Sequence, residues 1–211
     1  MAFDSNTIAA LQSGALVIVD FLTIHGWDSD GDPADYCFWT GPGNITTNVV
    51  SAIDGSTDSR NFIGDGALLG VPAIVDGIGL EARSHGFGLN PLHASVLDMV
   101  NGGRIRVARV ELQRGLRDAA TGALVSTPFP YFLGRVDGLQ VEAGAVGNDG
   151  QAAETTMTLT VVSDAIDLTR TNPALKSDAQ QSLRSGDHIR RYADTVGQYQ
   201  VWWGQAREAD G

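Results

Sequence analysis

The sequence predicts a mainly β protein: a β-barrel or curled antiparallel sheet with a few short helices. Residues 154–162 alternate apolar and polar side chains, as a strand with one buried face does. Two other strand-like segments switch the parity of their apolar residues partway, which is the effect of a β-bulge. The chain also has 26 glycines among 211 residues, above the usual share of about 7%, without a collagen period. Bulges and glycine bends are the features that curl a sheet.

The first part of the chain predicts a helix followed by two paired strands. Asp4 fits the N-cap of a short helix that ends before Gly14. Residues 15–24 are apolar at both parities, which predicts a strand buried on both faces. A polar loop separates this run from a second strand at residues 34–40. Because no helix lies between the two strands, we expect them to pair antiparallel.

Residues 44–77 are weakly patterned, with Gly or Asp every few positions, and predict a loop-rich insertion. Short strands are expected within it and after it, at residues 67–69, 71–75 and 79–89. Asn90-Pro91 then opens a short helix, in which Leu92, Val96, Leu97 and Val100 follow helical spacing and Gly102-Gly103 ends the run.

The middle third carries the clearest strand signals. In residues 104–112, Ile105 and Val107 share one parity, while Ala108, Val110 and Leu112 share the other. Residues 131–141 repeat the switch after Gly138, and residues 118–122 (DAATG) supply a hairpin turn. We therefore expect long, bulged strands joined by a tight turn.

The C-terminal part differs in character, and we divide the chain into a β domain at 1–170 and an extension at 171–211 that packs on or beside it. Ser177 and Gln180 fit a capping box that starts a short helix, which stops near Gly186. Trp202 and Trp203 follow close to the C-terminus. Large aromatic side chains of this kind serve as a core plug or as docking anchors, and both interpretations stay open.

Charge and composition exclude several classes of protein. With 14 basic and 25 acidic residues the formal net charge is −11, which argues against binding that rests on neutralising phosphates. No apolar run approaches the roughly 20 residues of a membrane span, and the first residues lack the pattern of a signal peptide. Cys37 is the only cysteine, so no internal disulfide is expected.

The sharpest local motif is a group of four aspartates within eight residues: Asp28, Asp30, Asp32 and Asp35. Calcium prefers six to eight oxygen ligands, and alternate aspartates in a tight loop can supply some of them. The EF-hand pattern nevertheless fails, because its glycine position holds Pro33 and its bidentate glutamate position holds Trp39. A weak calcium site and a solvated hairpin tip are the two interpretations.

No catalytic or cofactor motif is present, and we expect that the protein is not an enzyme and holds no cofactor. The histidines show neither HExxH spacing nor a partner spacing with Cys37, which argues against zinc; they are His25, His85, His93 and His188. No GxSxG elbow occurs. Cys37 lies within a strand pattern and is interpreted as a small buried hydrophobe rather than a nucleophile.

Several blocks of the sequence resemble a family of small tail proteins of tailed bacteriophages and phage-like gene transfer agents, including the lambda-L-like tail-tip proteins. The blocks are residues 11–14 (LQSG), 19–22 (VDFL), 36–41 (YCFWTG), 62–74 (FIGDGALLGVPAI), 109–112 (RVEL), 132–138 (FLGRVDG), 178–181 (DAQQ), 185–187 (SGD) and 202–204 (WWG). Together they cover most of the chain, and their motifs are structural. Lambda-L-like proteins can carry a cysteine-ligated iron–sulfur domain, which Cys37 alone cannot supply.

The resemblance implies a virion component, made in the host cytoplasm, that forms a ring at the distal tail or baseplate hub. Its implied partners are further copies of itself, in a ring of three or alternatively six, the adjacent tail-tube or distal-tail proteins, and the tip proteins. DNA would pass only in transit, with no membrane involved. The net charge of −11 would suit a lumen through which DNA slides, and a lumen lined by Arg104, Arg106 and Arg109 would contradict that idea.

Two other functions remain open at the level of sequence. One is a carbohydrate- or receptor-binding β module of the tail tip that uses Trp27, Trp39, Trp202 and Trp203. The other is a cell-wall hydrolase carried on the tail, which would need catalytic carboxylates such as those of the 28–35 loop.

Overall fold

A computed structural model describes residues 5–74, 83–143, 155–169, 177–192 and 197 of the chain. The chain divides into two compact units, Met1–Thr169 and Arg170–Gly211, and each is described by itself. The fold is mainly β, as the sequence predicts. None of the helices in the described ranges is long and apolar enough to cross a membrane.

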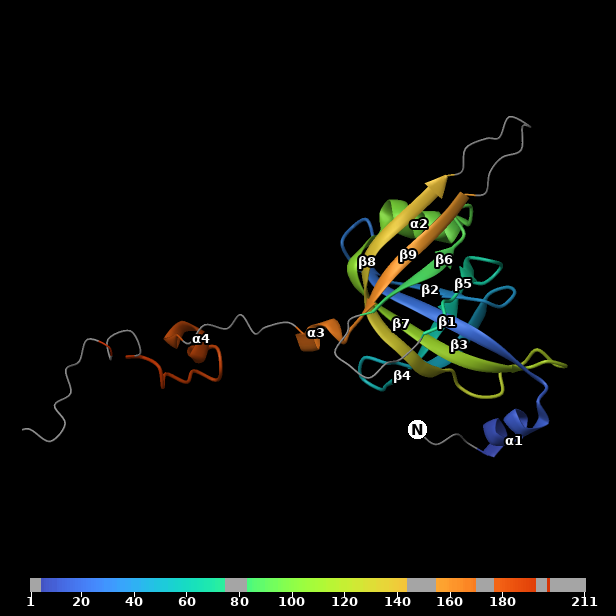
Figure 1. The fold of residues 1–211 in the computed structure, drawn as a ribbon, viewed down its shortest axis with the longest axis horizontal. Coiled ribbons are helices and arrows are strands. Elements are labelled where there is room, and N and C mark those ends of the chain that lie inside the picture. The colour runs from blue at the N-terminus through green and yellow to red at the C-terminus, as the bar shows by residue number, and fades with distance from the viewer. Residues whose placement is uncertain (1–4, 75–82, 144–154, 170–176, 193–196, 198–211) are drawn as a thin grey trace, which may run out of the picture. The chain divides into compact units, whose positions relative to one another are not determined.

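Seven strands of the first unit form one antiparallel sheet in the order β2-β1-β7-β8-β9-β6-β5 (Figure 1). Their bounds are β1 Leu16–Trp27, β2 Pro33–Trp39, β5 Leu68–Gly70, β6 Ser84–Leu89, β7 Arg104–Asp118, β8 Phe129–Ala143 and β9 Thr155–Ser163. Strands β3 (Ile45–Val50) and β4 (Thr57–Phe62) form a hairpin of their own. A single parallel bridge between Phe38 and Ile63 joins this hairpin to β2.

The large sheet is curled around one apolar core but does not close into a barrel within the described residues. The core cluster takes side chains from both ends of the strand order, including Leu22 of β1, Phe87 of β6 and Leu159 of β9, all 0% exposed. Of the two alternatives that the sequence allows, a closed barrel or a curled sheet, the structure has the curled sheet. Glycines and bulges therefore bend the sheet without closing it.

Both predicted bulges are confirmed. In the β1–β7 ladder, His25 pairs with Arg109 but Trp27 pairs with Arg104, so three extra residues of β7 are accommodated between the two pairs. In the β8–β9 ladder the register shifts between Val136 and Gly138. The alternation in β9 is also confirmed, since Met157, Leu159 and Val161 are buried while the intervening threonines are more exposed.

The turn after β7 forms as predicted. Gly122 takes a φ of 71°, and its N–H donates to the carbonyl of Asp118. The Asp118 carboxylate accepts hydrogen bonds from the N–H groups of Ala120 and Thr121 at 2.8 and 2.7 Å. An aspartate that caps its own turn, followed by a glycine with positive φ, fixes the direction in which the chain leaves β7.

The prediction that residues 15–24 are buried on both faces is wrong at their start. Val17 and Ile18 are 49% and 59% exposed, whereas Phe21, Leu22 and Ile24 are fully buried. The cause is the register: β2 begins to pair with β1 only at Phe21, opposite Trp39. The first residues of β1 therefore have β7 alone beside them.

The expectation of an irregular segment at 44–77 is also wrong in part, because β3 and β4 are regular and paired over their whole length. Alternate residues of the hairpin, such as Val49 and Phe62, are buried against the sheet. Most of the other residues in the hairpin are threonine, serine, asparagine and aspartate. The alternation is therefore not visible as a pattern of hydrophobic residues. The short strand expected at 67–69 is β5, which pairs with β6, but residues 71–74 form no strand. Of the strand expected at 79–89, residues 84–89 are β6, and residues 79–82 lie outside the described residues.

The described part of the first unit contains three helices: α1 (Ser5–Ser13), α2 (Ala94–Gly102) and α3 (Ile166–Thr169). Helix α1 ends before Gly14 as predicted, and its expected cap Asp4 lies outside the described residues. Helix α2 begins later than predicted, because the His93 ring, rather than Asn90-Pro91, caps it by accepting from the Ser95 N–H. Its buried residues are Val96 and Met99, while Leu92 is 85% exposed.

The second unit contains α4 (Asp178–Ser182) among its described residues. Its predicted cap is confirmed, since the Ser177 hydroxyl accepts from the Gln180 N–H. Trp202 and Trp203 lie outside the described residues.

Candidate functional site

The structure places a charged carboxylate, Glu111 of β7, beneath the β3–β4 hairpin with 0% of its surface exposed. Burying an unpaired carboxylate would cost several kcal/mol. Glu111 instead accepts five hydrogen bonds, from the His25 ring, the Arg60 guanidinium, the Ser51 hydroxyl, the Ala52 N–H and the Gln113 amide. The carboxylate is therefore the centre of a buried polar network, in which Gln113 Oε1 is the one buried polar side-chain atom of the described residues without a hydrogen-bond partner.

His25 of β1 lies between two carboxylates. Its Nδ1 is 2.7 Å from Asp35 Oδ1, and its Nε2 is 2.6 Å from Glu111 Oε1. Hydrogen bonds to Asp35 and Glu111 favour the protonated ring over the opposing effect of burial, and they raise the pKa of His25 to about 9. The His25 contact likewise holds the pKa of Asp35 below its usual value. His25 is therefore a cation at neutral pH.

Burial alone would raise the pKa of Glu111, but the His25 and Ala52 hydrogen bonds and the charge of Arg60 outweigh it and lower the pKa to about 2. Arg60 of β4 donates to Glu111 Oε1 and to the Thr23 hydroxyl, both at 3.2 Å. These bonds connect the hairpin to β7 and β1. The network thus fixes the β3–β4 hairpin on the outer face of the sheet.

The arrangement of Asp35, His25 and Glu111 differs from a catalytic relay. Both nitrogens of the His25 ring are occupied by carboxylates, so the ring has no free lone pair with which to take a proton from a nucleophile. The nearby Ser51 hydroxyl is 4% exposed and is itself bound to Glu111 at 3.3 Å. This geometry instead holds the β3–β4 hairpin on the sheet by ion pairs and hydrogen bonds. We call the network of His25, Asp35, Arg60 and Glu111 the Glu111 lock.

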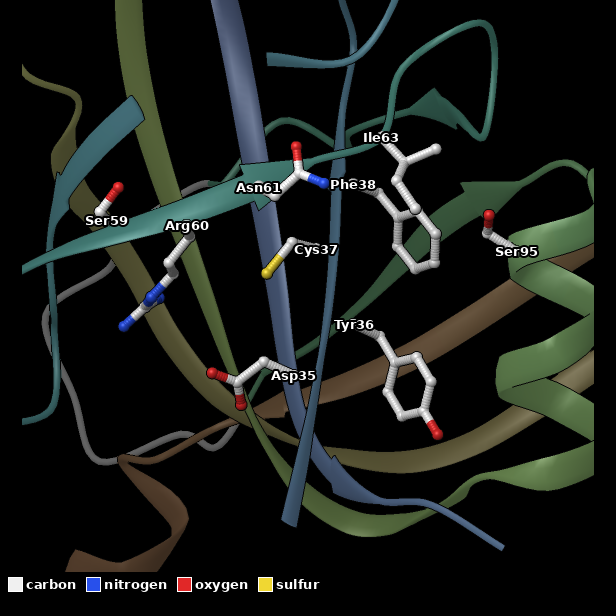
Figure 2. A pocket seen from close by; sticks show the side chains of 9 residues that line it. All are labelled: Asp35, Tyr36, Cys37, Phe38, Ser59, Arg60, Asn61, Ile63 and Ser95. Carbon is white, nitrogen blue, oxygen red and sulfur yellow. The ribbon is translucent and has the colours of Figure 1, made fainter. Parts of the chain in front are cut away.

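A cleft of about 420 Å³ opens beside this lock, between β2 and β4 (Figure 2). Its walls come from residues 35–38 of β2, residues 59–61 of β4, Ile63 and Ser95 of α2. In Figure 2, Asp35, Cys37 and Arg60 lie toward one side and Phe38 and Ile63 toward the other. The Phe38–Ile63 bridge lies at one end of the cleft.

Among the described residues, the backbones of the two strands are hydrogen-bonded to each other only at this bridge. The Ile63 N–H donates to the Cys37 carbonyl, and the Trp39 N–H donates to the Ile63 carbonyl, both at 3.0 Å. In a regular parallel ladder the next bonds would join the Cys37 N–H to Asn61 and the Asn61 N–H to Asp35. Within the described part of the chain these groups have no backbone partner. Two strand edges therefore face each other across the cleft, unpaired.

Cys37 lines the cleft but is 7% exposed and packs in a small apolar cluster with Phe21 and Trp39. Burial raises the pKa of its thiol to about 11. A thiolate nucleophile needs a lowered pKa. The prediction that Cys37 is a small buried hydrophobe is confirmed.

Two of the four aspartates proposed for calcium, Asp28 and Asp35, have separate roles. Asp28 Oδ1 accepts the N–H groups of Asp30, Gly31 and Asp32 at 2.9–3.0 Å, which closes the loop between β1 and β2. Asp35 is committed to His25. Among the residues that the structure describes, no three His, Cys, Asp or Glu side chains gather around a point that could hold a metal ion.

The tryptophans proposed for carbohydrate binding also differ from one another. Trp39 is 2% exposed, stacks on Phe21 with ring centroids 5.5 Å apart, and donates its indole N–H to the Gly43 carbonyl. It is a core residue and has no face available for a ligand. Trp27 is 43% exposed at the end of β1. Trp202 and Trp203 lie outside the described residues.

The sequence alone did not reveal the lock. Glu111 alternates with Val110 and Leu112, so hydrophobic periodicity places it on a solvated face. Its partners His25 and Arg60 are 86 and 51 positions away in the chain. A charged residue in the middle of an apolar strand was the one available signal, and it becomes informative only once the hairpin is known to cover that face.

No protein-family model matches this chain, and no curated protein matches it. Among solved structures, a chain in the virion of a native gene transfer agent particle is similar, with 18% identity and a TM-score of 0.47. The match covers 83% of this chain and 50% of that chain, so this chain spans about half of the other's length. A likeness at this level carries no argument about function.

Proposed function

We propose that this protein is a structural component of the tail of a bacteriophage or phage-like particle. In this role it forms a ring at the distal tail or baseplate hub and joins the tail tube to the tip proteins. The proposal starts from the sequence blocks that resemble small tail proteins. The observation that carries it is the cleft between β2 and β4, where two strand edges are left unpaired.

Unpaired strand edges are templates for another strand, and proteins normally protect them. The Cys37 N–H, the Asn61 N–H and carbonyl, and the Asp35 carbonyl face the cleft without a backbone partner among the described residues. An extended segment of a neighbouring chain would complete the missing ladder by β-strand addition, in which main-chain hydrogen bonds supply the affinity. Such head-to-tail contacts generate a ring when the rotation between subunits closes.

The lock at Glu111 suits this role because it holds both walls of the cleft. Arg60 lies on β4 and binds Glu111 on β7, while Asp35 on β2 binds His25 on β1. Both walls are thereby tied to the same pair of central strands. A preformed cleft lowers the entropic cost of ordering an incoming strand.

We favour a ring of three subunits over a ring of six, and adjacent tail-tube and tip proteins as the other partners. Arg104, Arg106 and Arg109 of β7 are all exposed. If DNA slides through an acidic lumen, this strand must face away from it.

The experiment that tests the function combines the mass of the purified protein with antibody labelling of intact particles. We expect a native mass equal to a small multiple of the 22.2 kDa chain, and label at the end of the tail away from the head. A protein that stays monomeric at high concentration and is absent from particles would overturn the proposal.

A further inference from the structure

A second pocket, of about 680 Å³, lies where β1 ends and β7 begins. It is lined by Trp27 at the end of β1, Gly31 in the following loop, and residues 103–106 at the start of β7. These residues take no part in the Glu111 lock or in the β2–β4 cleft. The pocket is large enough for one or two sugar rings or another small ligand, since ligand pockets span roughly 300–1,000 Å³.

The pocket is built by the bulge of β7. Three extra residues separate the Trp27–Arg104 pair from the His25–Arg109 pair, and Val107 within the bulge has a φ of 63°. Seven described glycines of this chain take positive φ, so a β-branched residue in that conformation stands out. Such strain persists where the surrounding structure imposes it, and bulges re-aim side chains beside binding sites. The bulge therefore places Arg104 and Arg106 at the pocket.

The base of the pocket is held by close backbone approaches. A Cβ on Gly103 would lie 2.5 Å from the Met99 carbonyl oxygen and 2.6 Å from the Tyr36 hydroxyl. A Cβ on Gly26 would lie 3.1 Å from the Arg104 carbonyl oxygen. Position 103 therefore requires glycine, position 26 leaves little room for a side chain, and the start of β7 is fixed tightly against β1 and α2.

The two arginines at the pocket have no carboxylate partner among the described residues. Arg60, Arg114 and Arg135 all form ion pairs with carboxylates. Arg104 and Arg106 are exposed and have no ion-pair or hydrogen-bond partner among the described residues. Two guanidinium groups thus line the same pocket as the exposed indole of Trp27.

We propose that this pocket binds an acidic saccharide, a sugar ring that carries a carboxylate. The guanidinium groups of Arg104 and Arg106 both pair with carboxylate oxygens of the ligand, for which the planar fork of arginine is well suited. The indole of Trp27 covers the apolar C–H face of the sugar ring, since a tryptophan presents a large flat apolar surface. This assignment does not depend on the assembly role, and its failure would leave that role untouched.

The pocket favours a saccharide over a nucleic acid. The chain carries a net charge of −11, and the loop that contributes Gly31 to the pocket also holds Asp28, Asp30 and Asp32. These carboxylates repel a polyphosphate backbone more strongly than a saccharide with one carboxylate per ring, in which uncharged hydroxyls outnumber the carboxylates.

The test is isothermal titration of the full chain with trigalacturonic acid. Maltotriose serves as the uncharged probe and a single-stranded oligonucleotide as the polyphosphate probe. We expect binding of trigalacturonic acid that Arg104→Ala, Arg106→Ala or Trp27→Ala each weakens about tenfold or more. Arg109→Ala is the matched control, because this exposed arginine lies on the same strand beyond the bulge and does not line the pocket; it should change the affinity less than twofold.

Three results would overturn the assignment: no binding of trigalacturonic acid, equally tight binding of maltotriose, or tighter binding of the oligonucleotide. An equal loss with Arg109→Ala would also overturn it, since the effect would then be one of general charge. Unchanged thermal unfolding of each variant shows that the loss lies in the pocket and not in the fold.

Discussion

The β1–β7 pair has two buried faces that are stabilised in different ways. The inner face is mainly apolar, with Leu22, Ile24 and Leu112 packed in the main core. The outer face buries polar groups, with Thr23 and Glu111 at 0% exposure beneath the β3–β4 hairpin, beside a smaller apolar cluster. Apolar packing accepts many arrangements of similar volume, whereas hydrogen bonds and ion pairs require one. The inner face therefore makes the sheet stable, and the outer face determines where the hairpin lies.

The largest effect is expected from breaking the outer face. Glu111→Ala leaves the Arg60 guanidinium buried without its central partner and removes an acceptor from His25. Removing one partner of a buried ion pair costs about 4 kcal/mol of unfolding free energy. Chemical denaturation followed by circular dichroism measures the loss. A loss below about 1 kcal/mol would mean that the carboxylate contributes little to the hairpin's position.

A cavity in the apolar inner face should lower the free energy of unfolding slightly less and leave the hairpin in place. Leu112→Ala creates a cavity in the main core and is expected to cost about 3 kcal/mol. Hydrogen exchange separates the two variants. Amides of β3 and β4 should lose protection before the rest of the sheet in Glu111→Ala, and together with the sheet in Leu112→Ala. The same order of exchange in both variants would contradict the division between the faces.

A rise in pH is expected to weaken the ion pairs of His25 on the outer face. The pKa of His25 is raised from 6.5 to about 9 in the folded protein, so its contribution is complete below pH 6.5 and is lost as the pH rises through 9. Because its partner Asp35 is half exposed, we expect a loss of about 2 kcal/mol rather than the full value of the shift. Denaturation at pH 6 and pH 9.5 tests this expectation. His25→Gln is the control and should show a smaller difference between the two pH values.

At the acid side the sign is reversed. The pKa of Glu111 is lowered from 4.5 to about 2, so its contribution is present above pH 4.5 and is lost as the pH falls toward 2. The outer face should therefore be most stable between about pH 4.5 and 6.5. A maximum of stability at pH 8 or above would contradict the placement of a protonated His25 between two carboxylates.

The smallest effect on stability is expected at the bulge of β7, at Val107. Val107→Gly relieves a positive φ that a β-branched residue adopts at a cost, and it should stabilise the protein by about 0.5–1 kcal/mol. Thermal unfolding measures this gain. Val125→Gly, at a half-buried position outside the strands, is a suitable comparison and should destabilise. A loss of stability in Val107→Gly would show that the valine side chain, 57% exposed, contributes more than its backbone costs.

The contrast between the faces also explains what the sequence could predict. The inner face, both bulges and the turn at Asp118 to Gly122 follow local rules, so the pattern of residues 104–162 predicts them. The outer face depends on contacts between distant residues, such as Glu111 with His25 and Arg60. No local rule predicts that a polar hairpin at residues 45–62 covers a polar face. For the same reason the aspartates of the 28–35 loop suggest a site in sequence, although in the structure Asp28 closes its loop and Asp35 joins the lock.

Assembly through the open cleft is the central claim, and one pair of variants tests it directly. Asn61→Pro removes an N–H that faces the cleft, whereas Asn48→Pro removes one on the opposite edge of the same hairpin, where the Val50 N–H also points away from β4. Proline is tolerated on a strand edge, so both variants should fold with the thermal stability of the unaltered protein. Native mass measurement should then show assemblies for the unaltered chain and Asn48→Pro but only monomers for Asn61→Pro. Assemblies of equal mass and abundance in both variants would contradict the account.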